Sequence, residues 1–485
     1  MSHNSYKSKI TLMTVSIVGT FQDGAIAIAN GGLGAAVVVD PRNQRFKGLI
    51  TDGDLRRALL NGAVSTTKLD EIVNQEALTI KQGTPAEKIA SLFTEAIRVI
   101  PILNEVQNVV DIAVFDKRLH LPVAEPYLTG RELVYVTDCI VSGWISSSGK
   151  YVKKFESLVA ESCNTKFGIS TTSGTTALHL ALVAAGIGRG DEVIMPTLTF
   201  IATASAVHHA GARPVLVDVD KTTMCIDPEL ISGAISSRTK AVIPVHLYGH
   251  PANMDKIKEI AERHRLWVIE DAAEAQGSLF NGSPAGSLGH MGVFSFYGNK
   301  TITTGEGGMI VTNNSDLADK MRLFRDHGMD PQQRYWHPVV GFNYRMTNLQ
   351  AAVGVGQMEK YDAIVQRKKE IAETYRKHLK DSSNIILPIQ ESWAEHSYWL
   401  YTILIDKPGG AALRNEVINQ LKRENIEARP TFIPLHRQPP FKENKIFPMS
   451  DYIADNGISL PSFFALKDSD IQRISSIVKT AATSV

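Results

Sequence analysis

The 485-residue chain carries 51 basic and 50 acidic side chains, which gives a formal net charge of +1. This balance excludes an overall field that would draw nucleic acid or an anionic membrane to the protein, so we expect neither as a partner. A hydrophobic share of 44% is ordinary for globular protein, and the length allows two or three domains. Any recognition of anions must therefore be local.

The three cysteines are far apart and form no CxxC pair, which is typical of unpaired thiols in a reducing compartment. They are Cys139, Cys163 and Cys225. The first residues, MSHNSYKSKITLMTVSIV, contain too short an apolar stretch for a secretory signal, and no run of the sequence is long enough for a membrane span. We therefore predict a cytoplasmic protein.

Residues 1–120 contain an internal repeat of apolar strands. AAVVVD followed by FKGLITDGDL, at 35–55, is echoed by VIPILNE followed by VVDIAVFDK, at 99–117. The segment TPAEKIASLFTEA between the copies predicts a helix that begins at a capping box of Thr84 and Glu87. Its apolar positions fall on one face: Ile89, Leu92, Phe93 and Ala96.

The stretch GLITDGDLRRAL resembles the cystathionine-beta-synthase-type (CBS) regulatory modules, and the repeat would make residues 1–120 a tandem pair of them. The resemblance implies that Thr51 and Asp54 contact the ribose and phosphate of a regulatory nucleotide. The second copy departs from the pattern at Asp111, Val114 and Lys117, so at most one intact site is implied. The alternative is that Thr51 and Asp54 only cap the helix that follows them.

Residues 119–130 contain Pro122 and Pro126 and predict a linker into the second part of the chain. From Phe167 onward, short apolar runs alternate with helical patterns, which indicates an α/β domain with a mostly parallel sheet. We place this large domain at 121–370 and a smaller α+β domain at 371–485.

Lys300 lies in the glycine-rich stretch FSFYGNKTITTGEGG, and the run LWVIEDA upstream ends in Glu270 and Asp271. An acidic pair after a buried strand falls at the sheet edge where α/β folds bind ligands. Schiff-base chemistry on pyridoxal phosphate (PLP) needs a lysine amine, a carboxylate for the pyridine nitrogen and a cradle for the phosphate. Lys300 and Asp271 match the first two requirements.

A cradle for phosphate is predicted where the strand KFGIST runs into an amphipathic helix, because the first amides of a helix and nearby hydroxyls bind anions. Its residues are Ser173, Gly174, Thr175 and Thr176. The alternative is an ordinary helix cap built from the same residue types. Ser295 can add a donor to the phosphate, or it can face a polar side of its strand.

Two further features leave alternatives open. Phe200 follows the strand DEVIMP and can stack on a pyridine ring, although most phenylalanines belong to a core. His246 and His250 have the spacing of a metal pair, but Gly249 and Pro251 argue against the helix that would align them. We predict no metal.

From about residue 121 to the C-terminus the chain resembles the fold-type I sugar aminotransferases of the DegT/DnrJ/EryC1/StrS family. The motifs that carry the resemblance are SGTTALHLAL, PTLTFIATASAV, VIPVHLYG, VIEDAAEAQGS, FSFYGNKTITTGEGGM and GFNYRMTNLQAAVG. It implies that Lys300 holds PLP as a Schiff base, that Asp271 meets the pyridine nitrogen and that Phe200 stacks on the ring. It also implies that residues 173–176 and Ser295 hold the phosphate.

The same resemblance implies a homodimer with shared active sites, in which Asn343 reaches the phosphate of the neighbouring subunit; a dimer of dimers stays open. Many members have glutamine where this chain has Glu274, which leaves open whether Glu274 or Gln276 approaches the phenolic oxygen of the cofactor. Cationic groups suit a nucleotide diphosphate, and the candidates for this role are His327, Arg345 and Arg429.

Within the family, the stretch around Lys300 is most similar to that of the perosamine synthases. This similarity implies transfer of an amino group from L-glutamate to C4 of GDP-4-keto-6-deoxy-mannose. One alternative is an aminotransferase for UDP-linked keto sugars of the legionaminate or bacillosamine type. Another is a nucleotide-sensing protein whose PLP fold has no turnover; the presence of Lys300 argues against it.

Overall fold

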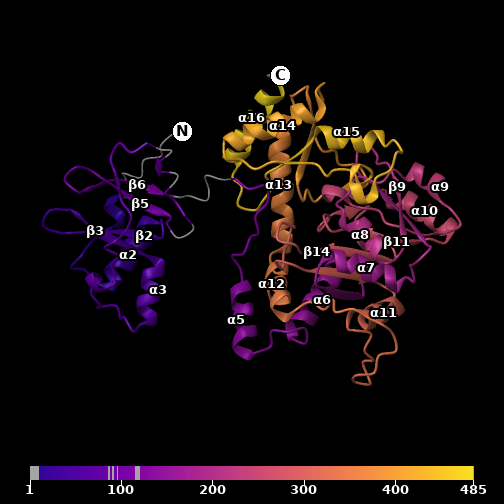
Figure 1. Ribbon diagram of the computed structural model, residues 1–485, viewed down its shortest axis with the longest axis horizontal. Coiled ribbons are helices and arrows are strands. Elements are labelled where there is room, and N and C mark those ends of the chain that lie inside the picture. Colours follow the sequence, from indigo (N-terminus) through magenta and orange to yellow (C-terminus); the bar gives the residue numbers. More distant parts are fainter. Residues whose placement is uncertain (1–9, 86–87, 90–91, 95–96, 115–120, 484–485) are drawn as a thin grey trace. The chain divides into compact units, whose positions relative to one another are not determined.

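The computed structural model describes residues 10–85, 88–89, 92–94, 97–114 and 121–483. The chain divides into two compact units, 1–120 and 121–485 (Figure 1). Each unit has its own sheets and its own buried core.

The first unit consists of two three-stranded sheets of the same topology. In each sheet the first strand runs parallel to the second, and the second and third form an antiparallel pair with one register shift. The repeat predicted from the sequence is therefore confirmed as a repeat of strand pairing. The described elements are β1 (Thr14–Ser16), α2 (Phe21–Gly31), β2 (Ala35–Val39), β3 (Phe46–Thr51), α3 (Asp52–Leu60), β4 (Ile80–Lys81), β5 (Val99–Leu103) and β6 (Val109–Val114).

The helix predicted from Thr84 to Ala96 lies partly outside the described residues, as do Glu87, Ala96 and Lys117. Of its apolar positions, Ile89 is buried in a small cluster that Leu92 and Phe93 also join.

Thr51 and Asp54 form the capping box of α3. The Thr51 amide donates to Asp54 Oδ2 at 2.9 Å, and the Thr51 hydroxyl donates to the same oxygen at 2.7 Å. Arg57 forms an ion pair with the other oxygen of Asp54. Thr20 and Asp23 form the same box at the start of α2. The amide of Asp54, in the first turn, in turn donates to the Thr51 hydroxyl at 3.2 Å, so the two residues do cap α3. Their contact with a nucleotide stays a prediction.

The second unit is built on a seven-stranded sheet of order β7-β15-β14-β11-β10-β8-β9. All neighbours pair in parallel except β15, which is antiparallel to both β14 and β7. The predicted mostly parallel sheet is therefore confirmed. Its strands are β7 (Phe167–Thr171), β8 (Glu192–Pro196), β9 (Arg213–Val217), β10 (Thr239–Val242), β11 (Trp267–Asp271), β14 (Met291–Ser295) and β15 (Gly308–Thr312).

Helices cover both faces of this sheet. α7, α8 and α11 share one apolar cluster with the strands, while α10 packs on the opposite face together with α5, α6 and α12. In the middle of the sheet the strands show no alternation and are buried on both sides, as a layer between helices requires. The helices are α5 (Glu132–Ser142), α6 (Lys150–Ser162), α7 (Gly174–Ala184), α8 (Ala202–His209), α9 (Ile231–Ala234), α10 (Met254–His264), α11 (Ser315–Arg325) and α12 (Asn348–Met358).

The C-terminal part of this unit holds an antiparallel sheet of order β16-β18-β20-β19, covered by α13, α14 and α16. The long helix α13 joins it to the large sheet and spans the border predicted between residues 370 and 371 (Figure 1). The elements are α13 (Tyr361–Leu379), β16 (Ile385–Ile386), β17 (Ala394–Glu395), β18 (Tyr401–Ile405), α14 (Gly410–Arg423), β19 (Arg429–Pro430), α15 (Pro448–Asn456), β20 (Gly457–Leu460) and α16 (Asp468–Thr483). β17 pairs with β12 (Leu279–Phe280), which pairs with β13 (Ser283–Pro284).

The predicted linker at 119–130 is wrong at Leu121 and Val123, which pack on the second unit. Leu121 exchanges backbone hydrogen bonds with Asn425 and Glu427, and the side chain of Val123 is fully buried. Most residues from Glu125 to Gly130 are exposed, including Leu128.

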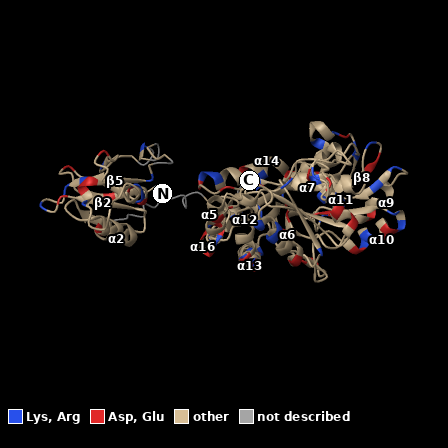
Figure 2. Cartoon of the chain, turned by 90° about the horizontal axis from the view of Figure 1, so that it is seen from below, with Lys and Arg blue, Asp and Glu red and all other residues tan. Residues whose placement is uncertain are grey.

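Acidic and basic side chains are interspersed over each unit (Figure 2). All three cysteines are buried and free, as predicted. Within the described residues, no helix is both long enough and apolar enough to cross a membrane.

Candidate active site

The carboxyl ends of the parallel strands bring the predicted residues together. β8, β11 and β14 run in the same direction, so Phe200, Asp271 and Ser295 follow strands that end at one edge of the sheet. β7 also ends there, because it lies antiparallel to β15. Lys300 follows β14 on the connection that returns as β15.

Asp271 is a buried carboxylate held by two donors. Thr203 Oγ1 donates to Oδ2 at 2.7 Å, and the amide of Ala273 donates to Oδ1 at 3.2 Å. Burial raises the pKa of Asp271, while these hydrogen bonds and the nearby charge of Lys300 oppose the rise. The carboxylate is therefore short of compensating positive charge, and a protonated ring nitrogen would supply it.

The amine of Lys300 lies between an acid and an aromatic ring. Its Nζ is 3.3 Å from Oε1 of Glu274 and 3.7 Å from the centre of the Trp399 ring. Glu274 is buried, and burial raises its pKa against the opposing effects of Lys300 and of the Tyr248 amide, which donates to Oε2 at 3.0 Å.

Glu274 and Gln276, the two candidates from the sequence, make different contacts. Gln276 donates to the carbonyl of Ser295 at 2.8 Å and accepts from the amide of Ile302 at 2.9 Å, so its side chain links the end of β14 to the lysine loop. Of the two residues, Glu274 is the one that faces the reactive amine.

The predicted phosphate cradle is also a helix cap. Ser173 and Thr176 form the capping box of α7. The amides of Gly174 and Thr175 belong to the first turn, where helix geometry provides no intrahelical acceptor. A Cβ at position 174 would lie 2.9 Å from the Cβ of Ser295, so glycine allows the helix start and the end of β14 to meet. First-turn amides and the Ser295 hydroxyl thus converge, as an anion site requires.

These residues fit PLP. The buried carboxylate of Asp271 suits a pyridinium, the convergence of the α7 N-terminus with Ser295 suits a phosphate, and the partly buried amine of Lys300 suits an aldehyde carbon. All three groups lie at the same sheet edge.

Phe200 and Asn343 are exposed in the single chain. The side chain of Phe200 is 55% exposed, which excludes the alternative that it belongs to the core, and its ring centre is 5.8 Å from that of Phe432. The carbonyl of Tyr344, the neighbour of Asn343, accepts from the amide of Thr172 at 2.9 Å. The Asn343 segment is therefore attached to the turn that leads into α7.

The three predicted cationic residues do not form a group. Arg345 pairs with Asp326 at 3.1 Å, and His327 is exposed in the strained left-handed region with φ of 58°. Arg429 pairs with Glu427 at 2.8 Å on β19, in the C-terminal sheet. The structure joins His327 and Arg345 to one segment, through the Asp326–Asn343 bridge, and places Arg429 on a different element.

His246 and His250 have different partners. Nδ1 of His246 accepts from the Ala252 amide at 2.9 Å, so its Nε2 carries the proton donated to Glu270 at 2.9 Å. His250 Nδ1 donates to the carbonyl of Pro251 at 2.7 Å. Both rings are thus used to hold the backbone around the site.

Sequence reasoning missed Thr203, Tyr248 and Trp399. Thr203 falls on the first turn of α8, where a helix cap would have been the ordinary interpretation. Tyr248 and Trp399 stack at 6.3 Å between ring centres, yet they are 151 positions apart in sequence, and no local pattern links them. Only the fold brings Trp399 beside Lys300.

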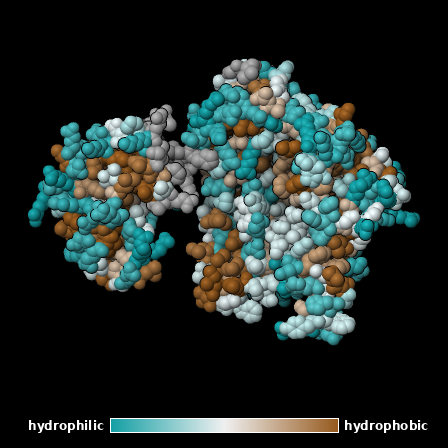
Figure 3. Space-filling view, in the orientation of Figure 1, coloured by the Kyte–Doolittle hydropathy of each residue, from teal (hydrophilic) through white to brown (hydrophobic). Residues whose placement is uncertain are grey.

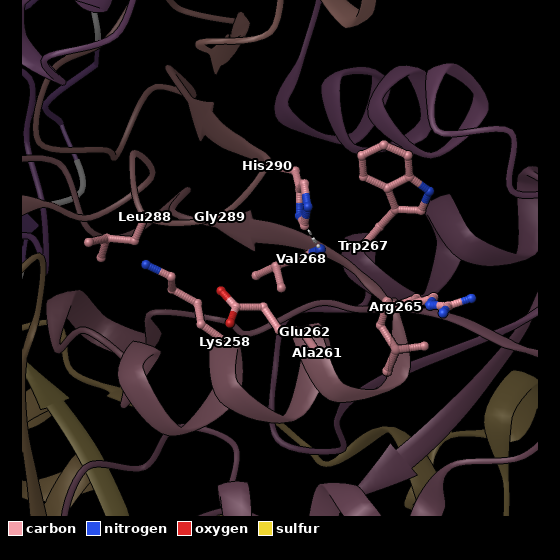
Figure 4. A pocket seen from close by; sticks show the side chains of 10 residues that line it. Lys258, Ala261, Glu262, Arg265, Trp267, Val268, Leu288, Gly289 and His290 are labelled. Atoms are coloured by element: carbon pink, nitrogen blue, oxygen red, sulfur yellow. Dashed lines mark hydrogen bonds between the residues drawn. The ribbon is translucent and has the colours of Figure 1, made fainter.

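A cavity of about 390 Å³ lies elsewhere, at the amino end of β11 (Figure 4). Lys258, Glu262 and Arg265 reach it from α10, and Trp267 and His290 complete its wall. Ligands of open α/β sheets bind at the opposite, carboxyl edge, so this cavity is separate from the site around Lys300.

The chain matches the DegT/DnrJ/EryC1/StrS aminotransferase family over residues 126–479. It is 47% identical to the GDP-perosamine synthase of Caulobacter vibrioides over 357 residues, which is 73% of this chain and 96% of the relative. It is 44% identical to the GDP-perosamine synthase of Escherichia coli O157:H7 over 353 residues, with coverages of 73% and 96%.

Solved structures share the fold as well. Spr1654 from Streptococcus pneumoniae, in its PLP form, superposes with a TM-score of 0.72 at 28% identity and covers 75% of this chain and 99% of that one. The agreement spans the second unit and leaves residues 1–120 unmatched by the family. Given this agreement and the site around Lys300, the chain belongs to the DegT/DnrJ/EryC1/StrS aminotransferase family and is a PLP-dependent enzyme of it.

Proposed function

We propose that the enzyme transfers the amino group of L-glutamate to the C4 ketone of a nucleotide-linked 4-keto-6-deoxy sugar, namely GDP-4-keto-6-deoxy-D-mannose, and so makes GDP-perosamine. The observation that carries the amino transfer is the amine of Lys300, placed beside Glu274 and near the buried Asp271. The sugar is supported by the two relatives named GDP-perosamine synthase, at 47% and 44% identity.

When bound, PLP supplies an electron sink and a carrier for the amino group. Asp271 keeps the ring nitrogen protonated, and Thr203 and the Ala273 amide hold that carboxylate in place. Lys300, as a free amine, removes the proton from the carbon of the amino donor and returns a proton on the side of the sugar. Glu274 stands at 3.3 Å from this amine and orients it.

The enzyme acts as a homodimer in this proposal. α5 and the residues after it expose a group of large apolar side chains, which appears as a brown area around α5 (Figure 3). Its members are Leu133, Val134, Ile140, Val141, Trp144 and Ile145. Such a concentration is uncommon on a monomer and is typical of an interface. In this proposal the exposed Asn343 reaches the phosphate site of the second copy, and two dimers can join further.

Residues 1–120 have a regulatory role in this proposal, as a CBS-type pair that binds an adenosine or guanosine nucleotide at Thr51 and Asp54. The repeated sheet topology supports a module pair. Both residues already cap α3, and Asp54 also pairs with Arg57, so a ligand would have to share these contacts.

Lys300→Ala is expected to leave a folded protein that loses at least about 10³-fold of its amino transfer, because no other amine replaces the proton carrier. The measurement is product identification with glutamate and GDP-4-keto-6-deoxy-mannose, beside the UDP-linked keto sugars of the alternative function. Lys377→Ala, an exposed lysine of α13, is the control. Unchanged turnover in the Lys300 variant refutes the assignment, and a preference for UDP sugars refutes the substrate.

Asp271→Asn is expected to raise the thermal unfolding midpoint of the cofactor-free protein at pH 8 while abolishing amino transfer. Ionising this buried carboxylate at alkaline pH costs free energy that the neutral amide does not cost. Because burial raises the folded pKa of Asp271, the wild-type protein regains this stability as the pH falls toward 4. The difference between variant and wild type should therefore shrink in acid; a constant difference would contradict the explanation.

The double change Ile140→Asp and Val141→Asp is expected to convert the dimer to a monomer, since two carboxylates cannot be buried unpaired at an interface. Light scattering on a sizing column reports the mass. Leu230→Asp, at an exposed leucine remote in sequence from α5, should leave the dimer intact. A dimer that persists in the double variant would place the interface elsewhere.

Titration calorimetry of the full chain with ATP, AMP, GTP and GDP is expected to give saturable heat with one of them, and Thr51→Ala should abolish it. Loss of a cap costs about 1 kcal/mol by itself. Thr20→Ala removes the matching cap of α2 and controls for that cost. Absence of heat with all four nucleotides would leave residues 1–120 a structural module.

A further inference from the structure

Lys368 is a lysine buried inside the second unit, outside the residues considered so far. Its side chain on α13 is 5% exposed, and its Nζ donates to the carbonyl of Trp399 at 3.0 Å and to both the carbonyl and the hydroxyl of Ser462. These acceptors are neutral oxygens. Burial lowers the pKa of Lys368 to about 7, because the charged amine loses its solvation by water.

The two segments that Lys368 joins lie at one end of a strand pair. Trp399 precedes β18 by two positions and Ser462 follows β20 by two, and Tyr401 of β18 is paired with Leu460 of β20. Lys368 therefore links the two chains just beyond the end of the strand pair, where the carbonyls of Trp399 and Ser462 lie outside the β-sheet pairing. An amine can bind both carbonyls at once, which an apolar side chain of the same length cannot do.

Trp399 in turn contacts Lys300 on two sides. Its ring centre is 3.7 Å from the amine of Lys300, and its Nε1 donates to the carbonyl of Asn299 at 2.8 Å. The ring also stacks on Tyr248 with an interplanar angle of 8°. A lysine ammonium over an indole face is attracted by the ring quadrupole, so Trp399 provides a place for the amine when it is not bonded to the cofactor.

We propose that Lys368 is a positioning residue, which fixes the backbone of Trp399 and through its indole ring holds the free amine of Lys300 for proton transfer. This inference rests on the proposed role of Lys300. It requires neither a particular sugar nor a particular nucleotide.

The test compares Lys368→Met, Trp399→Phe and the double variant in the full chain, with Lys377→Met as the matched control on the same helix. In the cofactor-free protein, the initial rate at which acetic anhydride acylates Lys300 is measured by peptide mass spectrometry. We expect this rate to rise about two- to fivefold in both single variants, because the amine loses its contact with the indole. The control should keep the wild-type rate.

In the PLP-loaded enzyme, kcat is expected to fall about tenfold or more in Lys368→Met, with KM for glutamate changed less than about twofold, because a displaced proton carrier slows chemistry without weakening donor binding. Lys368→Met should have little further effect on either readout in the Trp399→Phe background. Additive effects would overturn the proposal, as would wild-type acylation in Lys368→Met.

If Lys368→Met does not fold, Trp399→Phe decides, because it keeps the Trp399 carbonyl that Lys368 binds. An unchanged acylation rate in that variant would overturn the proposal. Since acylation needs no substrate, failure here is distinct from an incorrect sugar, which the product assay alone reveals.

Discussion

The site depends on two carboxylates buried around one amine. Asp271 and Glu274 both lie out of water, and burial raises the pKa of each. Thr203 and the amide of Ala273 hold Asp271, and the amide of Tyr248 holds Glu274. Lys300 lowers the pKa of both carboxylates. Two buried acids beside one amine favour a further positive group, and a cofactor with a protonated ring nitrogen would supply it. The buried carboxylates would therefore favour both the binding of the cofactor and the protonated ring that catalysis needs.

The mostly parallel sheet brings the residues of the site together, because its parallel strands end at the same edge. The segments that follow β7, β8, β11 and β14 are far apart in sequence but meet at the site, because these strands run in the same direction and end at one edge of the sheet. Behind that edge, buried polar groups such as Glu270 hold the turns: its carboxylate accepts from the amides of Gly286, Leu288 and Gly289. Glu270 and Asp271 thus have different roles, because adjacent residues of a strand face opposite sides of the sheet. Glu270 holds the backbone of the turns, and Asp271 faces the site.

Much of this could be predicted from the sequence where the signal is local. The strand that ends in Asp271, the turn at residues 173–176 and the glycines around Lys300 are contiguous patterns, and they indicated the parallel sheet and the cofactor. Glu274 against Gln276 could not be decided, because their two-residue spacing leaves side-chain direction to the loop. Trp399 and Lys368 were not found, since their importance comes from packing between distant segments. The segment at 121–123 was mistaken for part of a linker because the nearby prolines were given more weight than Leu121 and Val123.

The antiparallel strand β15 limits how the length of the lysine loop can change. Ser295 and Gly308 face each other across β14 and β15, and a Cβ at Gly308 would lie 2.2 Å from the carbonyl of Ser173, so the lysine loop is clamped at both ends. An insertion or deletion there would slide the reactive nitrogen away from its acids. The stretch that carries the exposed Tyr335, Trp336 and Val340 differs: close backbone contacts at Gly328 and Gly341 fix its base, but its solvent-facing tip can become longer or shorter without moving the lysine loop.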